Sequence, residues 1–436
     1  MPEFFIRTFG CQMNKSDSER IAGVLIENGY SRAADPERAD VILFNTCCVR
    51  KHAEDRLLGN VNALRALKRK RKDLVIAIGG CYAQKQKEQL FSLLPHVDLV
   101  FGTHNASNLP ALIEAAQRNG RNICEIREAD SVLPTRLPVD RDSKLFGWIP
   151  VSVGCDNHCT YCVVPSVRGS EVSLPLEEIV REAEGFAAEG GKEITLLGQN
   201  VNSYGRDLYG GSRFDLLLKK LDGIEGLERI RFTTSHPKDL NDAIIEAIVG
   251  CAKVCGHIHL PVQAGSDRIL ELMNRGYTSS EYMAIVEKIK SKIPSCGLTT
   301  DIMVGFPGEE ERDFKQTLSV VNNAMFDQAF MFIYSPREGT PALELPGQVG
   351  EEQKKERFLR LVELQDRITW ELNKGMIGLK FKLLVEGRAK KDRNMFFGRT
   401  DSNKVVNFQA SDVMEGSMVE TEVIEAHKKS LVGRVC

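Results

Sequence analysis

The chain has 436 residues, a length typical of roughly two to four domains. Its composition, 42% hydrophobic and 27% charged, is that of a soluble globular protein. Lys and Arg total 58 and Asp and Glu total 60, so the net charge of −2 excludes nucleic-acid binding through overall charge and leaves only local basic patches. No apolar run approaches the roughly 20 residues of a membrane span, and no secretory signal is visible, so we expect a cytoplasmic protein. Twelve cysteines in such a chain favour metal ligation or catalysis over a disulfide framework.

The first third of the chain alternates short apolar runs with helical patterns. The predicted strands are Glu3–Phe9, Val41–Asn45, Leu74–Ile78 and Leu99–Gly102. The predicted helices are Asp17–Asn28, Arg50–Arg71 and Ala83–Leu94. This alternation indicates an open parallel α/β domain over residues 1–133, and the proline-containing, charged stretch Ser131–Ser143 is typical of a linker.

A second alternation begins at Trp148 and has the spacing of repeated βαβ units. The predicted strands are Trp148–Val153, Glu193–Leu197, Ile230–Thr234, His257–Leu260, Thr299–Val304 and Ala329–Tyr334. The predicted helices include Leu176–Glu189, Lys238–Ile248, Ser279–Lys290 and Glu310–Asn323. Six such steps predict a partial (β/α)6 barrel over residues 144–373, because a complete barrel would need eight.

The end of the chain changes character. A charged amphipathic helix is predicted over Glu351–Lys374, followed by strands at Lys380–Glu386, Phe396–Thr400, Lys404–Phe408, Met418–Ala426 and Leu431–Val435. Five short strands with turn signals predict a small all-β barrel over residues 374–436.

The most specific local motif is VGCDNHCTYCVVP, in which Cys155, Cys159 and Cys162 follow the first strand of the predicted partial barrel. Three thiolates on one loop can hold three irons of a [4Fe–4S] cluster, and the fourth iron is then free to chelate a substrate or cofactor. The alternatives are a zinc site that includes His158 and a loop without metal.

A second set of cysteines is scattered in sequence, but each member follows a predicted parallel strand. Cys11, Cys47 and Cys81 come after the first three strands, and the carboxyl ends of parallel strands share one edge of a sheet. We therefore expect the three thiols to meet there, unless they are merely small buried side chains. Cys48 adjoins Cys47 and leaves the choice of ligand ambiguous, although Cys47 is in register with the other two. No role is expected for the remaining cysteines, which are Cys124, Cys251, Cys255, Cys296 and Cys436.

These motifs resemble a known family. The cysteine loop, with Tyr161 before its last cysteine, resembles the radical S-adenosylmethionine superfamily. The blocks FGCQMNKSDSER, NTCCVRKHAEDR and IGGCYAQ are similar to the methylthiotransferases, and the GCQMN form with LLGQNVNSYG, HLPVQAGSDRIL, IMVGFPGE and YSPREGTPA most resembles MiaB-type tRNA methylthiotransferases. The final module resembles a TRAM domain, an RNA-binding barrel. Ala264, Tyr82 and Glu338 depart from residues common in that family; none removes a cluster ligand, so the family assignment stands and only the inference about fine substrate preference is affected.

The resemblance implies a transferase with two [4Fe–4S] clusters that uses two equivalents of S-adenosylmethionine per turnover. The cluster on Cys155, Cys159 and Cys162 binds S-adenosylmethionine, and its reduction gives a 5′-deoxyadenosyl radical that removes the C2 hydrogen of N6-isopentenyladenosine at position 37 of tRNA. The auxiliary cluster on Cys11, Cys47 and Cys81 supplies sulfur, which is methylated, so the product carries a 2-methylthio group. Related enzymes modify N6-threonylcarbamoyladenosine or a ribosomal protein aspartate, and the GCQMN form argues against both. A non-enzymatic RNA-binding protein with structural zinc is a third hypothesis.

The resemblance also implies that some residues of the predicted barrel contact S-adenosylmethionine. Polar side chains at or just past the strand ends are candidates for S-adenosylmethionine contacts, with helix capping or turn formation as the alternative. With the loop tyrosine, this cofactor set is Tyr161, Gln199, Ser235, Gln263 and Asp301. We expect a monomer whose partners are the tRNA anticodon loop, S-adenosylmethionine and an electron donor of unknown identity, with no membrane.

The start of the final module is locally basic. Residues 374–404 hold nine Lys or Arg against three acids, and Phe396 and Phe397 interrupt this run. Such interleaving suits phosphate contact and base stacking, although a solvated basic surface with the aromatic rings in the core would have the same composition. The RNA-binding candidates are Lys380, Lys382, Arg388, Lys390, Lys391, Arg393, Phe396, Phe397 and Arg399. The run KRKRK at Lys68–Lys72 is a second basic candidate, and helix-end cations are also common for the helix dipole.

Overall fold

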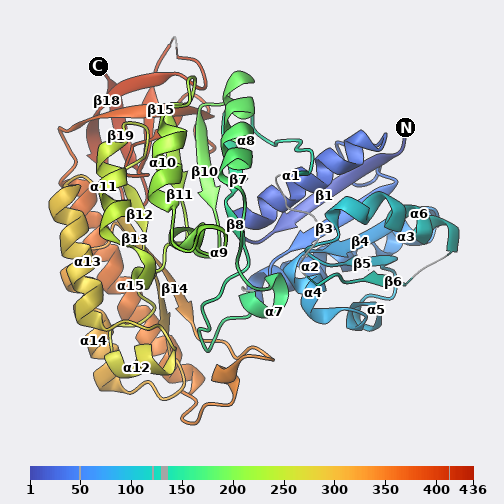
Figure 1. Cartoon of the computed structure of the whole chain (residues 1–436), viewed down its shortest axis with the longest axis horizontal. Coiled ribbons are helices and arrows are strands. Elements are labelled where there is room, and N and C mark those ends of the chain that lie inside the picture. The colour runs from blue at the N-terminus through green and yellow to red at the C-terminus, as the bar shows by residue number, and fades with distance from the viewer. Residues whose placement is uncertain (49–50, 120–121, 129–135, 412) are drawn as a thin grey trace. The chain divides into compact units, whose positions relative to one another are not determined.

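The structure is a computed structural model, and it describes residues 1–48, 51–119, 122–128, 136–411 and 413–436 (Figure 1). The chain divides into two compact units. Unit 1 comprises Met1–Asn157, Cys162–Gly185 and Leu196–Gln199, and unit 2 comprises His158–Tyr161, Phe186–Thr195 and Asn200–Cys436. The expected domain boundary at residue 133 and the first part of the expected linker lie outside the described residues. In the ranges that are described, no helix has the length and apolar character needed to cross a membrane.

Unit 1 begins with a six-stranded parallel sheet in the order β2-β1-β3-β4-β5-β6. Its strands are β1 (Glu3–Phe9), β2 (Ser31–Arg32), β3 (Val41–Thr46), β4 (Val75–Gly79), β5 (Leu99–Phe101) and β6 (Ile123–Glu125). Its helices are α1 (Gln12–Glu27), α2 (Lys51–Ala63), α3 (Arg65–Lys70), α4 (Cys81–Gln86), α5 (Gln89–Leu93) and α6 (Leu109–Asn119). The predicted open α/β domain is confirmed.

Successive residues of the central strands face opposite cores, so both faces of this sheet are covered. Val41 and Leu43 pack with residues of α1 and α6, whereas Ile42 and Phe44 pack with residues of α2 and α5. Three predictions need correction here. Edge strands β2 and β6 are too short to show a period and were not predicted. The single helix predicted over Ala83–Leu94 is interrupted at Lys87, whose φ of 50° lies outside the α-helical region. The single helix predicted over Arg50–Arg71 is two helices, α2 and α3.

Six further strands belong to the partial barrel. They are β7 (Phe146–Pro150), β10 (Glu193–Leu197), β11 (Arg229–Phe232), β12 (His257–His259), β13 (Gly297–Val304) and β14 (Gln328–Ile333). They form the sheets β11-β10-β7 and β12-β13-β14, and a parallel bridge between Ile230 and Val254 continues β11 toward β12 within unit 2. The predicted partial (β/α)6 barrel is confirmed, except that Trp148–Val153 is not one strand. The chain leaves β7 at Pro150, which lacks an N–H, and β8 (Ser152–Val153) pairs with β9 (Val172–Ser173).

The helices of this region are α7 (Val164–Arg168), α8 (Leu176–Ala188), α9 (Arg206–Tyr209), α10 (Phe214–Asp222), α11 (Asp242–Gly250), α12 (Asp267–Leu272), α13 (Ser279–Lys292) and α14 (Glu311–Ala324). Helix α11 begins later than predicted because the Asn241 side chain caps it, accepting the Ile244 N–H at 3.0 Å.

The last part of unit 2 matches its prediction closely. Helix α15 spans Glu351–Lys374 and is followed by the C-terminal strands, of which β15, β18 and β19 are labelled in Figure 1. These strands form a closed barrel in the order β15-β16-β17-β19-β18. Its strands are β15 (Lys380–Arg388), β16 (Phe396–Arg399), β17 (Val405–Gln409), β18 (Met418–Ala426) and β19 (Leu431–Val435). Arg229 and Arg231 of β11 attach this barrel to the rest of unit 2 by donating to the carbonyl oxygens of Lys382, Arg399, Thr400 and Asp401.

Candidate metal centres

The cysteine loop after β8 directs N–H groups at its sulfurs. The backbone N–H of Asn157 donates to Cys155 Sγ at 3.4 Å, and that of Val164 donates to Cys162 Sγ at 3.4 Å. In unit 2, a guanidinium nitrogen of Arg275 lies 3.4 Å from Cys159 Sγ. Each thiol therefore accepts a hydrogen bond from nitrogen. Donors of this kind stabilise sulfur that carries negative charge, as in cluster ligation.

Gly154 sets the entry into this loop. Its φ is 83°, and a Cβ atom there would lie 2.0 Å from the carbonyl oxygen of Ser170, so only glycine fits. The N–H of Gly154 donates to Gln199 Oε1 at 2.6 Å. Gln199, a candidate cofactor contact, thus uses its amide oxygen to position the cysteine loop.

The strand ends of unit 2 hold buried polar atoms without hydrogen-bond partners. Ser235, a candidate contact just past β11, is 3% exposed, and its Oγ has no partner. Asn200 Oδ1, Asn202 Nδ2 and His236 Nε2 are also buried and have no hydrogen-bond partner among the described residues. These three residues were not among the predicted contacts. Because leaving a buried polar group unpaired costs about 1–3 kcal/mol, these atoms indicate that a polar ligand fits here. The signal that could have found them is their position after β10 and β11.

His236 presents a donor to this region. Burial, assisted by the charge of Arg275, lowers the pKa of His236 to about 3, so the ring is neutral. Nδ1 accepts the backbone N–H of Lys238 at 3.3 Å, which places the proton on the unpartnered Nε2.

Backbone strain occurs at the same strand ends. Thr234 and Gln263 both have φ of 67°, which is rare for residues other than glycine and is typical of functional sites. Asp301, on β13, lies with its carboxylate 3.4 Å from His259 Nε2. Tyr161 packs edge-on against Phe306.

The second set of cysteines lies as predicted along one edge of the unit 1 sheet. Cys11 caps α1 after β1, Cys47 follows β3, and Cys81 begins α4 after β4. The three strands are adjacent in the order β1-β3-β4. Cys11 is hydrogen-bonded to Cys47, and Cys81 is hydrogen-bonded to Cys48. Cys47 therefore contacts Cys11, and its neighbour Cys48 contacts Cys81. That Cys47 rather than Cys48 is the cluster ligand stays a prediction.

Two thiols at this edge are readily deprotonated. A hydrogen bond from Cys47 lowers the pKa of Cys11 to about 6; burial opposes this shift and the charge of Arg168 assists it. In the same way a hydrogen bond from Cys48 lowers the pKa of Cys81 to about 7, with burial opposing and Arg168 assisting. Arg168, which ends α7, is 4% exposed. Low-pKa thiols beside a cation suit metal ligation.

A single metal ion and a cubane cluster make different demands on their ligands. In the part of the chain that the structure describes, no three or more His, Cys, Asp or Glu side chains converge as one ion requires. A cubane cluster makes a different demand, because each thiolate binds its own iron.

The RNA-binding candidates divide into surface and core. Lys380, Lys382, Arg388, Lys390, Lys391 and Arg393 are exposed, and Phe397 is half-buried. Phe396 contradicts the expectation, because it is 5% exposed and stacks on Phe408 in the barrel core. Adjacent strand residues point to opposite faces, so only Phe397 reaches the surface. Arg399 is half-buried and paired with Glu386 at 2.6 Å.

The run Lys68–Lys72 is partly structural. Lys68 is buried and paired with Asp98 at 2.7 Å, and Arg71 pairs with Asp40 at 2.8 Å. Two of the five cations are therefore used to hold unit 1 together.

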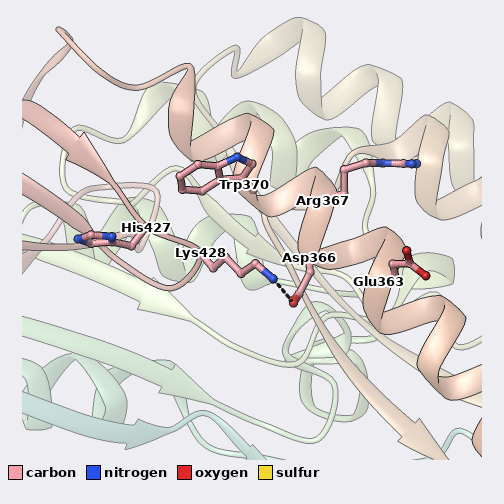
Figure 2. A pocket seen from close by; sticks show the side chains of 6 residues that line it. All are labelled: Glu363, Asp366, Arg367, Trp370, His427 and Lys428. Atoms are coloured by element: carbon pink, nitrogen blue, oxygen red, sulfur yellow. Dashed lines mark hydrogen bonds and ion pairs between the residues drawn. The ribbon is translucent and has the colours of Figure 1, made fainter.

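A groove of about 660 Å³ lies beside α15 and the β18–β19 turn (Figure 2). It is lined by Glu363, Asp366, Arg367, Trp370, His427 and Lys428. Figure 2 shows Lys428 reaching Asp366, at 3.0 Å. Acidic and basic side chains balance in this groove, so it lacks the excess of cations that phosphate binding requires.

Three families match successive parts of the chain. Residues 3–102 match the uncharacterized protein family UPF0004, residues 149–321 match the radical SAM superfamily, and residues 374–436 match the TRAM domain. Two solved structures share the fold at low identity. A radical S-adenosylmethionine methyltransferase, TsrM from Kitasatospora setae, has a TM-score of 0.56 at 12% identity, covering 79% of this chain and 74% of that chain. The cobalamin-dependent S-adenosylmethionine radical enzyme OxsB has a TM-score of 0.54 at 14% identity, covering 84% and 56%.

Curated relatives match over nearly the full length. A tRNA-2-methylthio-N(6)-dimethylallyladenosine synthase of Acetivibrio thermocellus is 46% identical over 99% of this chain and 90% of its own length. Synthases with the same name from Alkaliphilus oremlandii and Clostridium botulinum are each 47% identical over 99% of this chain, and cover 92% and 96% of their own lengths.

Proposed function

Because this chain belongs to the radical S-adenosylmethionine tRNA methylthiotransferases, the family of these synthases, we propose that it converts N6-isopentenyladenosine at position 37 of tRNA to its 2-methylthio derivative. Isopentenyl and dimethylallyl name the same substituent. The observation that carries the chemistry is the loop of Cys155, Cys159 and Cys162, in which each sulfur accepts an N–H. Such a loop is built for a cluster with one open iron.

The radical SAM family brings a [4Fe–4S] cluster and S-adenosylmethionine, and the proposal adds a second cluster on Cys11, Cys47 and Cys81. When bound, these groups supply the one-electron cleavage of the sulfonium and the sulfur, because an aromatic C–H bond is beyond ordinary acid–base catalysis. Two lowered thiol pKa values, at Cys11 and Cys81, support the second cluster, as does the charge of Arg168 beside them.

The chain's own part is to bind and orient. Gln199 and Gly154 hold the cysteine loop, and the unpartnered Ser235 Oγ and His236 Nε2 are placed to hydrogen-bond the polar groups of S-adenosylmethionine. Gln263, which follows β12 by four residues, and Asp301, in the middle of β13, complete the proposed set, and Tyr161 lies within the loop. Barrels of this class bind ligands at the carboxyl ends of their strands.

The tRNA anticodon loop is the proposed macromolecular partner. Its bases are unpaired and can be splayed out toward a protein. The exposed cations of β15 and the β15–β16 turn are proposed to contact its phosphates, and Phe397 is proposed to stack on a base. The proposal places the enzyme in the cytoplasm as a monomer, with an electron donor that has yet to be identified.

Mass spectrometry of tRNA nucleosides tests the substrate and the reaction together. Cells lacking this protein should lose 2-methylthio-isopentenyladenosine and accumulate isopentenyladenosine, and the intact gene should restore the product. A gene encoding Cys155→Ala should not restore it. Unchanged nucleosides, with loss of 2-methylthio-threonylcarbamoyladenosine or of a methylthiolated ribosomal aspartate instead, would transfer the function to the related substrates.

Iron and sulfide analysis tests the second cluster. Anaerobically reconstituted protein should carry about eight irons per chain, and the Cys11→Ala/Cys47→Ala/Cys81→Ala variant about four. Four irons in both proteins would remove the second cluster from the proposal. A colourless protein with zinc that does not cleave S-adenosylmethionine would indicate the non-enzymatic alternative.

A further inference from the structure

The end of helix α12 and the segment that follows it are hydrogen-bonded to the cysteine loop. The backbone N–H and hydroxyl of Thr160 donate to the carbonyl oxygens of Met273 and Leu272, at 3.1 and 2.8 Å. The Asn274 side chain donates to the carbonyl oxygen of His158 at 2.8 Å. All of these residues belong to unit 2, so loop and segment are held together within one compact unit.

The end of α12 places Arg275 in this contact. Asn274 has a φ of 55°, a left-handed conformation that ends helices, and the N–H of Arg275 bonds back to the Leu270 carbonyl at 3.0 Å. This turn sends the Arg275 side chain inward, where it is 5% exposed. A helix terminus with a left-handed asparagine thus delivers a cation to the interior.

Each nitrogen of the Arg275 guanidinium donates a hydrogen bond, and none of the acceptors is a carboxylate. It donates to the Pro261 carbonyl at 3.0 Å, to the Tyr277 hydroxyl at 3.0 Å, and to Cys159 Sγ and the Tyr161 hydroxyl at 3.4 Å each. Among the residues that the structure describes, no carboxylate forms an ion pair with it.

A buried cation without a counter-charge is costly. The tyrosines do not supply that charge, since burial raises the pKa of Tyr277 above its ordinary value. Of the side chains that Arg275 contacts, Cys159 is the one whose function as a cluster ligand requires it to be a thiolate.

We propose that Arg275 is a positioning residue of the radical SAM centre. Its guanidinium compensates the negative charge of the Cys159 thiolate, holds the cysteine loop in place and raises the reduction potential of the cluster. The inference rests on the proposed function for the presence of that cluster. Hydrogen bonds and positive charge at cluster sulfurs favour the reduced state, because reduction adds negative charge. Arg275 would therefore make the cluster easier to reduce by the electron donor.

The test measures a reduction potential rather than activity. Full-length protein carrying Cys11→Ala/Cys47→Ala/Cys81→Ala, so that one cluster remains, is reconstituted anaerobically and titrated with EPR detection of the reduced cluster. Arg275→Gln should reduce the equilibrium constant for reduction at least tenfold, which is a fall of about 59 mV for a one-electron couple. Arg275→Lys keeps the charge but loses the planar fork, so its potential should fall by less.

Arg268→Gln is the matched control. Arg268 lies on α12, the helix that precedes Arg275, pairs with Asp313 and is 39% exposed, so its loss should leave the potential unchanged. If Arg275→Gln retains no iron, Arg275→Lys decides: a lowered potential supports the inference. A potential equal to that of the parent in the variant that retains iron overturns it.

The outcomes also separate this inference from the proposed function. A parent protein that binds no iron and does not cleave S-adenosylmethionine contradicts the function itself. A parent that binds about four irons and cleaves it, with an unchanged potential in the Arg275 variants, contradicts only the role of Arg275.

Discussion

The carboxylate of Asp17 on α1 lies 2.6 Å from Nη2 of Arg168 at the end of α7, and this ion pair stands beside the thiols of Cys11 and Cys81. Arg168 follows the cysteine loop by only six residues, so one short helix connects the radical SAM motif to the other set of cysteines. Within unit 1, one helix therefore joins Cys162 of the first set of cysteines to the arginine beside Cys11 and Cys81.

Arg168→Gln should reduce the iron content from about eight toward about four per chain, because the thiolates of Cys11 and Cys81 lose their neighbouring cation. Asp17→Asn should lower the iron content less, because it removes the partner that holds Arg168 but also removes a negative charge that raises the pKa of Cys11 and Cys81. Iron and sulfide analysis measures both. Arg118→Gln, an exposed substitution in the same unit, is the control and should keep the full iron content. An unchanged iron content in Arg168→Gln would contradict the role assigned to this arginine.

Gly154→Ala should abolish cleavage of S-adenosylmethionine. The added Cβ would lie 2.0 Å from the Ser170 carbonyl oxygen, at a φ of 83° that alanine disfavours, so the cysteine loop has to shift. Gly185→Ala on α8 meets no atom within 4 Å and should keep activity while gaining about 0.5–1 kcal/mol of stability from helix propensity. Cleavage is measured as 5′-deoxyadenosine by chromatography, and equal rates in the two variants would be inconsistent with the prediction.

Arg231→Met should loosen the C-terminal barrel. Arg231 donates to the carbonyl oxygens of Thr400 and Asp401 at 2.9 Å each and pairs with the buried Glu193 at 3.0 Å. Its loss leaves Glu193 buried without a partner, at a cost of about 3–5 kcal/mol. Limited proteolysis should then release residues 374–436 faster than in the parent. Arg434→Met, whose side chain is 70% exposed, should not change the rate.

Acid should destabilise unit 2 through His257. Burial, with smaller contributions from Arg231 and His259, lowers the pKa of His257 to about 3. Because the unfolded chain titrates near 6.5, it binds more protons than the folded chain between these values, and stability falls as the pH drops below about 6.5. At pH 5 the cost is about 2 kcal/mol. His257→Gln should lose this part of the pH dependence, which thermal melts at pH 5 and pH 8 would detect as a smaller difference than in the parent.

Lys390→Gln/Lys391→Gln/Arg393→Gln should weaken tRNA binding and make it less dependent on salt. Neutralising three phosphate contacts changes the slope of log K against log salt by about 2. Filter binding at several salt concentrations measures the slope. Lys288→Gln/Lys292→Gln removes two exposed cations of α13 that pair with acids, and should leave the slope unchanged. If the triple variant has the same slope of log K against log salt as the parent, these three cations do not contact the phosphates of the tRNA.

Most of the architecture was predictable because its signals are local. Strands β1, β10, β18 and β19 and helix α15 have the predicted bounds, since strand-length runs and the helical spacing of α15 can be recognised from neighbouring residues. Short edge strands carry no period, and Lys87 carries no sequence signal for its positive φ, so β2, β6 and the break between α4 and α5 were missed. Phe396 and Phe397 show the same limit, because one residue of register decides which ring enters the core.

By itself, the sequence determined the spacing of Cys155, Cys159 and Cys162, because a ligand loop of eight residues is a local object whose chemistry its own residues specify. It also predicted that Cys11, Cys47 and Cys81 would follow adjacent strands, since parallel topology brings strand ends to one edge. Only the tertiary structure decided what surrounds those sulfurs. Arg275 reaches Cys159 from 116 positions away, through the turn at Asn274, and Arg168 reaches Cys81 through the packing of α7 in unit 1. Contacts of that kind depend on how elements pack rather than on any pattern within them.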